Sequence, residues 1–376
     1  MAKIKKIKEE YSEEAPKRNV LKEILKHSVI KETSLLSKSA IYNNETFIPT
    51  KIPVLNLFLS GKFKGGIAGN HTAIAGASAS FKSMLGLIMI KTYLDYYEDG
   101  IAIIYDSEKG FTSDYLNSLG IDADRIVIKP FGILEAFKND IVKVLDGLQR
   151  GDHVIILVDS ISNSGSAKEL NDSLENKDTT DMTRARVIKS IFRMITSSVA
   201  FKEIPLISIN HTYSSMDKYK EDEVSGGGGV KYSATNTLRI SKLKNAETGG
   251  VDFKIKAGKS RYIKEHTTFL LSIPKDGDIR HLSGLFELAV DYGFITTETQ
   301  GWYEVPCLVD YPKTRRRDIE NDRLFWKRVF EETNFAEIVE KSIAVSQDQK
   351  ALFQDIDEEF GEEFPNTEPE VHIDEN

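Results

Sequence analysis

Short apolar runs rich in β-branched residues alternate with longer helical segments over residues 51–210. The apolar runs lie at residues 72–75, 101–106, 125–128, 153–159 and 206–210. Between them, apolar residues recur at helical spacing over about 82–98, 134–149 and 181–202. Alternation of this kind predicts a mainly parallel sheet covered by helices, which is an α/β fold.

The pattern changes after residue 160. Two connections, 161–180 and 212–229, are too long for simple turns, and connections of this length in a compact domain usually carry function. Three strand-like segments follow at 237–242, 251–257 and 267–273, and we expect them to extend the sheet in antiparallel fashion. A smaller unit with helices near 284–292 and 318–345 comes last.

These patterns divide the chain into four parts. Residues 1–45 are polar with one helical stretch near residues 20–30, and we expect them to serve oligomerisation. Residues 46–283 form the sheet domain, residues 284–350 a small C-terminal domain, and residues 351–376 an acidic tail that is predicted to be disordered. The tail either keeps the protein soluble or competes with nucleic acid for basic grooves.

The uneven distribution of charge allows a polyanionic partner. The chain of 376 residues has a formal net charge of −8, but residues 351–376 contain ten acidic and no basic residues, so the remainder has a net charge of +2. Cys307 is the only cysteine, which excludes an intramolecular disulfide and fits a reducing compartment. With no apolar run of about 20 residues and no secretory signal, we expect a cytoplasmic protein without a membrane partner.

A phosphate-binding loop follows the first apolar run. Its residues are Gly76, Ala77, Ser78, Ala79, Ser80, Phe81, Lys82 and Ser83. Backbone N–H groups at a helix N-terminus bind phosphate, a lysine adds positive charge, and a serine hydroxyl binds Mg²⁺. The usual motif has glycine where this chain has Phe81, so we expect the loop to turn there without the positive φ that glycine allows. The loop predicts that the protein binds ATP and Mg²⁺.

Acidic residues end two of the predicted strands. Asp159 ends the run at 153–159, where a carboxylate can support the Mg²⁺ of a bound nucleotide. Asp106 and Glu108 end the run at 101–106 and begin the loop after it, and Glu108 is the better placed to act as general base for the attacking water.

Three further polar residues are candidates for the same chemistry. His211 follows the run at 206–210, where it could sense the γ-phosphate and act as a switch, although a histidine with no such role is the alternative. Lys259 and Arg261 follow a predicted strand. Such residues are usually solvated, but they could instead neutralise charge on the ATP of a neighbouring subunit, as arginine fingers do.

A series of ordered motifs runs over residues 51–303. The motifs are Lys51-Ile52-Pro53, Leu59-Ser60-Gly61, Gly65-Gly66, Ser80-Phe81-Lys82-Ser83, Tyr105-Asp106-Ser107-Glu108, Asp181-Met182-Thr183-Arg184-Ala185, Ile209-Asn210-His211-Thr212-Tyr213, Lys259-Ser260-Arg261 and Gly301-Trp302-Tyr303. Together they resemble the RecA family of homologous-recombination ATPases, most closely its phage branch, the UvsX recombinases of T4-like viruses. The phage branch also has a residue like Phe81 in its phosphate loop. The resemblance implies a RecA-like P-loop core and a DNA-dependent ATPase in the bacterial host cell of a phage. It also implies helical filaments on single-stranded DNA that exchange strands with a homologous duplex.

The resemblance assigns roles to single residues. In the ATP site, Lys82 and Ser83 would hold the phosphates and Mg²⁺, Asp159 would support the metal, Glu108 would activate water, and Tyr115 would pack near adenine. His211 stands where bacterial relatives have a glutamine that senses the γ-phosphate. Lys259 and Arg261 match the pair that reaches the ATP of the neighbouring subunit.

The two long connections match the DNA-binding loops of that family, but neither is basic. Each sets two lysines against four acidic residues. We therefore expect DNA contacts from backbone amides and a few side chains, with tyrosines that stack on bases. The candidates are Arg184, Tyr213, Tyr219, Gly226, Gly227, Gly228, Gly229 and Lys231. A recombination mediator and a single-stranded-DNA-binding protein are further candidate partners.

Two other functions share parts of the pattern. A RecA-fold hexameric DNA helicase would use the same loop and sheet for translocation in a closed ring. A P-loop kinase for a small molecule would need a lid with paired arginines, for which Arg315-Arg316-Arg317 is the nearest candidate. The recombinase is the leading hypothesis because it accounts for the largest number of ordered matches.

Overall fold

The structure, a computed structural model, describes residues 19–30, 32–43, 45–175, 183–213, 223–224, 228–243, 250–273, 281–299 and 301–345. Contacts divide the chain into residues 1–45 and residues 46–376. The first unit contains α2 (Val20–His27), η1 (Leu36–Lys38) and α3 (Ala40–Asn43). Asn19 caps α2 by accepting a hydrogen bond from Lys22 N at 3.0 Å, and the apolar Leu21 and Ile24 are exposed. The predicted helical stretch therefore ends at His27, because Ser28 is extended.

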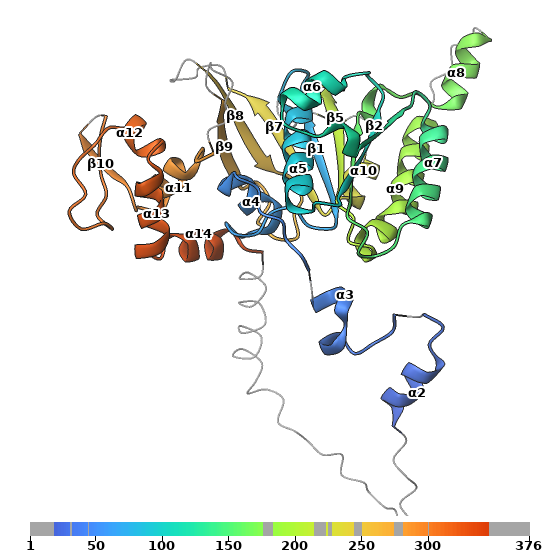
Figure 1. The fold of residues 1–376 in the computed structure, drawn as a ribbon, viewed down its shortest axis with the longest axis horizontal. Coiled ribbons are helices and arrows are strands. Elements are labelled where there is room, and N and C mark those ends of the chain that lie inside the picture. Colours follow the sequence, from blue (N-terminus) through green and yellow to red (C-terminus); the bar gives the residue numbers. More distant parts are fainter. Residues whose placement is uncertain are drawn as a thin grey trace, which may run out of the picture. The chain divides into compact units, whose positions relative to one another are not determined.

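One large sheet organises the second unit (Figure 1). Its strand order is β3-β2-β4-β5-β1-β7-β8-β9, and β6 pairs with the end of β5. The strands are β1 (His71–Gly76), β2 (Ile101–Asp106), β3 (Ile126–Pro130), β4 (Val154–Asp159), β5 (Leu206–Tyr213), β6 (Glu223–Val224), β7 (Asn236–Lys242), β8 (Val251–Ala257) and β9 (Thr268–Ile273). The pairs from β3 through β7 in this order are parallel. The predicted α/β fold is confirmed.

Of the three strands predicted to extend the sheet in antiparallel fashion, only β8 and β9 join it through antiparallel pairs. β8 pairs antiparallel with β7 and with β9, as predicted. β7 instead pairs parallel with β1, so the prediction was wrong for this strand. The reason is the crossover that precedes β7: a parallel neighbour requires a connection long enough to return to the same edge, and α10 (Gly228–Ser233) lies within that connection.

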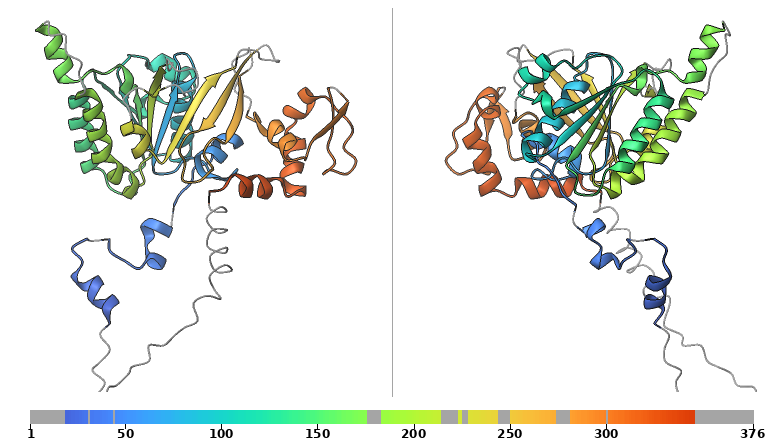
Figure 2. Two further views of the ribbon diagram at one scale, coloured as in Figure 1. Left: turned by 180° about the vertical axis from the view of Figure 1, so that it is seen from behind. Right: turned by 45° about the vertical axis from the view of Figure 1, so that its right-hand side comes forward.

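Helices cover both faces of the sheet (Figure 2). α5 (Lys82–Tyr96) packs on one face, where its Leu85 and Ile90 share a cluster with Ile155 and Leu157 of β4. On the other face, α7 (Leu134–Gly147) and α9 (Thr183–Phe201) share a second cluster with Ile156 and Val158. Alternate residues of a strand point to opposite faces, so both cores use the same strands. The predicted stripe of α9 is buried here, at Ile188, Ile191, Phe192, Ile195 and Val199.

Shorter helices occupy the connections. They are α4 (Pro53–Ser60), α6 (Ser113–Ser118), η2 (Ala123–Arg125), η3 (Ile161–Asn163) and α8 (Ala167–Leu174). The first long connection is thus partly helical, which the sequence analysis missed. The available signal was a capping box: Ser166 Oγ accepts a hydrogen bond from Glu169 N at 3.1 Å, and Glu169 Oε2 accepts one from Ser166 N at 2.7 Å.

The C-terminal region shares a core with the sheet. It contains α11 (Leu285–Asp291), β10 (Thr296–Thr299), β11 (Trp302–Glu304), α12 (Arg316–Glu320), α13 (Arg323–Glu332) and α14 (Phe335–Ile343). The helix predicted near 318–345 is therefore three short helices, and Asp322 caps the second by accepting from Leu324 N and Phe325 N at 2.9 and 3.1 Å. The ring of Phe63, from the segment after α4, lies 5.0 Å from that of Phe330. Aromatic packing thus joins this region to the sheet domain.

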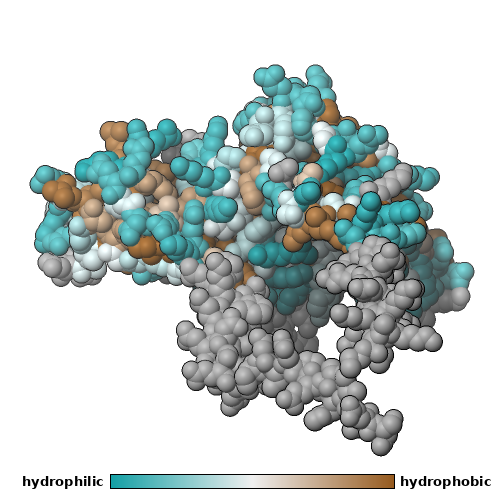
Figure 3. All heavy atoms as spheres, turned by 90° about the horizontal axis from the view of Figure 1, so that it is seen from below, coloured by the Kyte–Doolittle hydropathy of each residue, from teal (hydrophilic) through white to brown (hydrophobic). Residues whose placement is uncertain are grey.

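The visible surface is mostly polar. Seen from below, hydrophilic residues predominate over the described part, and apolar residues form small separate groups (Figure 3). Among the described residues, no helix is both long enough and apolar enough to cross a bilayer.

A buried histidine at the start of β1 predicts that stability depends on pH. His71 stacks on Phe192 with 4.8 Å between ring centroids, and its Nε2 lies 2.8 Å from Ser208 Oγ. Burial, and secondarily the charge of Lys259, lowers the pKa of His71 from 6.5 to about 3. Between pH 6.5 and pH 3, His71 is therefore protonated in the unfolded chain and neutral in the folded chain. Its contribution to the free energy of unfolding is fully present above pH 6.5 and is lost as the pH falls toward 3.

We expect the free energy of unfolding to fall by about 2 kcal/mol from this group between pH 7.5 and pH 5. The measurement is urea unfolding at both pH values, compared with a His71→Gln variant, which can still hydrogen-bond to Ser208 but does not titrate. The variant should lose that part of the pH dependence. An identical pH dependence in both proteins would contradict the assignment.

Candidate active site

The phosphate loop connects β1 to α5, as the sequence predicts. Gly76 is the last residue of β1, and a Cβ added there would lie 2.5 Å from the carbonyl oxygen of Ile240, so only glycine fits. Lys82 is the first residue of α5 and is 5% exposed. Its Nζ donates to the carbonyl oxygen of Ala77 at 2.6 Å and to Ser80 Oγ at 3.4 Å. Burial lowers the pKa of Lys82, and the carboxylates of Asp159 and Glu108 oppose that effect.

Phe81 does adopt the conformation that we expected the loop to avoid. Its φ of 70° lies in the left-handed region, and it is the N-cap of α5. Its ring stacks on Phe253 of β8, with 5.3 Å between centroids and an interplanar angle of 25°. Packing against the core thus offsets the backbone strain that glycine would avoid, and the turn keeps the geometry of the usual motif.

This arrangement predicts an order of stability for two variants at position 81. Both Phe81→Gly and Phe81→Ala lose the stacking on Phe253, but only alanine retains the strain of a positive φ. We expect Phe81→Ala to be less stable than Phe81→Gly by about 1 kcal/mol. Urea unfolding of the two purified variants measures the difference. An alanine variant as stable as the glycine variant would show that the left-handed turn is not retained.

Asp159 lies where a metal ion would meet the phosphates. It is 6% exposed at the end of β4 and is hydrogen-bonded to Ser83. Burial raises the pKa of Asp159, as do Glu108 and Asp106, whereas Ser83 and Lys82 lower it. The described residues contain no cluster of three or more His, Cys, Asp or Glu that could hold a metal ion alone. A hydroxyl and a carboxylate with nucleotide phosphates form a set of hard oxygen ligands, which fits Mg²⁺.

Three hydrogen-bond donors converge on one oxygen of Glu108. Oε1 lies 3.0 Å from Ser160 Oγ, 2.7 Å from Asn163 Nδ2 and 3.4 Å from His211 Nε2. The backbone N–H of Glu108 donates to Asp106 Oδ1 at 2.8 Å. The structure therefore brings together the predicted base and the predicted γ-phosphate sensor, and β2, β4 and β5 each end beside this carboxylate.

Ser160 and Asn163 are the residues that the sequence analysis missed. They lie one and four positions after Asp159, inside a serine-rich stretch with no periodicity. Their pairing with Glu108 joins residues more than 50 positions apart. No local signal in the sequence could have shown it.

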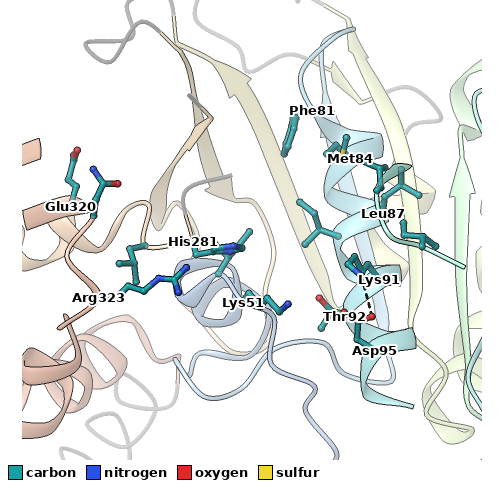
Figure 4. Close-up of a pocket in the computed structure, with 16 residues that line it drawn as sticks. Lys51, Phe81, Met84, Leu87, Lys91, Thr92, Asp95, His281, Glu320 and Arg323 are labelled. Carbon is teal, nitrogen blue, oxygen red and sulfur yellow. Dashed lines mark hydrogen bonds and ion pairs between the residues drawn. The ribbon is translucent and has the colours of Figure 1, made fainter. Parts of the chain in front are cut away.

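A cavity begins beside the phosphate loop (Figure 4). It has a volume of about 670 Å³ and runs along α5 from Phe81 and Met84 to Lys91 and Asp95. His281, Glu320 and Arg323 are among the residues lining it elsewhere. Tyr115 does not line the cavity, but Leu119, one helical turn later, does.

Lys259 and Arg261 lie near the amino ends of the parallel strands β1 and β7, whereas the phosphate loop of the same chain follows the carboxyl end of β1. The carbonyl oxygen of Lys259 accepts from Thr237 N at 2.7 Å, at the start of β7, and Thr237 pairs with Ala73 near the start of β1. Lys259 Nζ donates to the carbonyl oxygens of Tyr232 and Ala234, both at 2.9 Å. Burial lowers the pKa of Lys259, and nearby Arg261 lowers it further. Neither side chain is placed to serve the ATP site of its own chain.

The candidate DNA contacts have different surroundings. Gly228 begins α10, and Gly229 lies against α9, where an added Cβ would be 2.9 Å from Lys189 Cα. Lys231 is exposed on α10, close enough to Lys259 to affect its pKa. Tyr213 ends β5. Arg184 donates hydrogen bonds to backbone carbonyl oxygens of residues 161, 162 and 164. Tyr219, Gly226 and Gly227 lie outside the described residues, as does the acidic tail.

Comparisons with known proteins identify the family. Residues 36–272 match the RecA N-terminal domain, and residues 282–339 match the C-terminal domain of the bacteriophage T4 recombination and repair protein. The chain belongs to the RecA family of recombination ATPases. It is 35% identical to the recombination and repair protein of Enterobacteria phage T4 over 329 residues, which cover 85% of this chain and 84% of the relative.

More distant similarity reaches bacterial members. The chain is 27% identical to RecA of Mycoplasma mycoides over 295 residues, covering 76% of this chain and 81% of the relative. It is 25% identical to RecA of Chlorobium limicola over 246 residues, covering 64% and 68%. The family assignment does not favour the helicase alternative.

Proposed function

We propose that this protein is an ATP-dependent recombinase that assembles on single-stranded DNA as a helical filament and pairs it with a homologous duplex for strand exchange. The observation that supports the proposal is that the phosphate loop and the candidate pair Lys259 and Arg261 lie at opposite ends of the parallel strands. Asp159 and Glu108 lie at the same ends as the phosphate loop. A second copy stacked on the first would complete the ATP site, and repetition of that contact generates a filament.

Within this site, each residue has a separate task. Lys82 and the amides of residues 76–83 would bind the phosphates, and Ser83 and Asp159 would hold Mg²⁺, which neutralises charge on the phosphate oxygens. Glu108 would orient and deprotonate the attacking water, with Ser160 and Asn163 fixing its carboxylate. The end of the cavity beside Met84 would receive the nucleoside. Tyr115, which lies outside the cavity lining and one turn before Leu119, would reach the base from α6.

DNA would lie against the two long connections. Backbone amides near Gly228 and Gly229, Lys231, and the tyrosines Tyr213 and Tyr219 remain our candidates for these contacts. Sequence matching would come from base pairing between the strands, so few base-reading side chains are needed. A mediator and a single-stranded-DNA-binding protein would assist loading, in the cytoplasm of a phage-infected bacterium.

The kinase alternative finds no support among the arginines that it requires. Arg316 is engaged by Glu287 and Glu320, and the guanidinium of Arg315 lies 4.3 Å from the centre of the Trp302 ring. These contacts hold the C-terminal helices and hairpin together. They do not leave a pair of arginines to close over a phosphate.

The test is steady-state ATP turnover with and without single-stranded DNA, with electron microscopy of the same mixtures and Lys82→Ala as the blank. We expect strong stimulation by DNA, together with helical filaments. Closed rings with DNA-stimulated turnover would indicate a helicase. Turnover that is indifferent to DNA would overturn the proposal.

A further inference from the structure

The segment from Ser160 to Ser164 is held from two sides. On one side it contacts the catalytic groups: Ser160 and Asn163 donate to Glu108 Oε1, and Ser162 Oγ accepts from the backbone N–H of His211 at 2.7 Å. The Ser107 hydroxyl also donates to the carbonyl oxygen of Ser160 at 2.9 Å. The position of the Glu108 carboxylate therefore depends on where this segment lies.

On the other side, the guanidinium of Arg184 is hydrogen-bonded to the backbone of the same segment. Arg184 Nε donates to the carbonyl oxygen of Ser164 at 2.9 Å, and its Nη2 donates to those of Ile161 and Ser162 at 3.1 and 2.7 Å. All three bonds are partly buried. Only arginine presents several donors in one rigid planar fork, so lysine could not make this set of bonds.

We propose that Arg184 is a positioning residue for ATP hydrolysis, which holds the 160–164 segment and thereby the Glu108 carboxylate, and that it is not a DNA phosphate contact. This inference rests on the function proposed above. Its physical basis is that Nε and Nη2 of Arg184 bind backbone carbonyl oxygens of its own chain, in the same short segment whose Ser160 and Asn163 side chains hold the Glu108 carboxylate. Displacement of a catalytic group by about 1 Å can cost 100-fold in rate.

Arg184 is the second residue of α9, so its hydrogen bonds also connect that helix to the segment beside Glu108. The first predicted DNA loop, residues 161–180, ends three residues before α9 begins. Any rearrangement at the start of α9 would therefore move the 160–164 segment, which orients Glu108.

The experiment compares Arg184→Ala and Arg184→Lys with Arg193→Ala, which removes the same charge from an exposed position on the same helix. For each protein, we would measure kcat and KM for ATP at saturating single-stranded DNA, and the affinity for that DNA as a function of salt. We expect both Arg184 variants to lose about 10- to 100-fold in kcat, with KM and the DNA salt slope within about twofold of wild type. Arg193→Ala should match wild type.

Asn163→Ala tests the same link from the other end and protects against a folding failure of the Arg184 variants. It should also lower kcat without weakening DNA binding. The double variant Arg184→Ala/Asn163→Ala should be no slower than the slower single variant, because both changes release the same carboxylate. Additive losses would contradict the shared path.

Several results would overturn the inference. Normal kcat in Arg184→Ala with weaker DNA binding and a salt slope reduced by about 1 would identify a phosphate contact instead. Full rescue by Arg184→Lys would show that charge matters and the fork does not. If wild type itself shows no DNA-stimulated turnover, the proposed function fails and this inference with it. If DNA stimulates ATP turnover by wild type, and the Arg184 and Asn163 variants have wild-type kcat, this inference fails and the proposed function stands.

Discussion

The Glu108→Gln variant is expected to bind ATP normally and to turn it over about 10²- to 10⁴-fold more slowly than wild type. Glutamine keeps the size of the side chain, and its carbonyl oxygen can still accept hydrogen bonds from Ser160 and Asn163. It cannot take a proton from water. The loss should therefore appear in kcat, and filaments assembled with ATP should persist because hydrolysis no longer dismantles them.

Steady-state turnover and nucleotide binding measured on the same preparation would test this prediction. Glu98→Gln is a matched control, because it removes one carboxylate charge from an exposed position before β2, at the other end of that strand. The control should retain wild-type turnover. A Glu108→Gln variant within a few-fold of wild type would exclude Glu108 as the general base.

Arg261→Ala is expected to lower ATP turnover by about 10³- to 10⁵-fold, the range found when an arginine finger is removed. The special feature of this prediction is that the defect should be repaired by a second defective protein. Mixed with Lys82→Ala, the Arg261→Ala protein can contribute an intact phosphate loop while its partner contributes an intact Arg261. Some junctions in a mixed filament then contain both groups, and turnover should exceed the sum of the two separate proteins.

Mixing Arg261→Ala with Lys82→Ala tests whether Arg261 acts on the nucleotide of a neighbouring subunit, in addition to testing whether it is needed for turnover. Arg317→Ala removes the same charge from a side chain that is 84% exposed in α12 and has no proposed role in the ATP site, so this variant should have wild-type turnover. Turnover in the mixture equal to the sum of its components would mean that Arg261 does not act on a neighbour's nucleotide. Wild-type turnover by Arg261→Ala alone would remove it from the site.

Local patterns in the sequence determined the fold class and the position of the phosphate loop between a strand and a helix. Alternating helical and apolar segments predicted the parallel sheet because burial on both faces leaves strands continuously apolar. The loop at 76–83 and the acids after β2 and β4 were predictable because phosphate binding needs a strand, a turn and a helix N-terminus in succession. The long connections were also visible, although the capping box that begins α8 was overlooked.

Other features were decided only by the tertiary structure. The positive φ of Phe81 depends on a ring 172 positions later, Phe253, which offsets the strain by stacking. The direction of β7 depends on a crossover and not on its own residues. The grouping of Ser160, Asn163 and His211 around Glu108 requires three strands to end at one edge.

The sequence by itself determined a phosphate-binding α/β protein, because the signals for that are contained in short runs whose periodicity and spacing are local. Which polar groups meet was decided by the tertiary structure, because hydrogen bonds between residues more than 50 positions apart depend on strand order. The same holds for Lys259 and Arg261. Their chemistry could be guessed from the sequence, but their location at the end of the strands opposite the phosphate loop follows from the pairing of β1, β7 and β8.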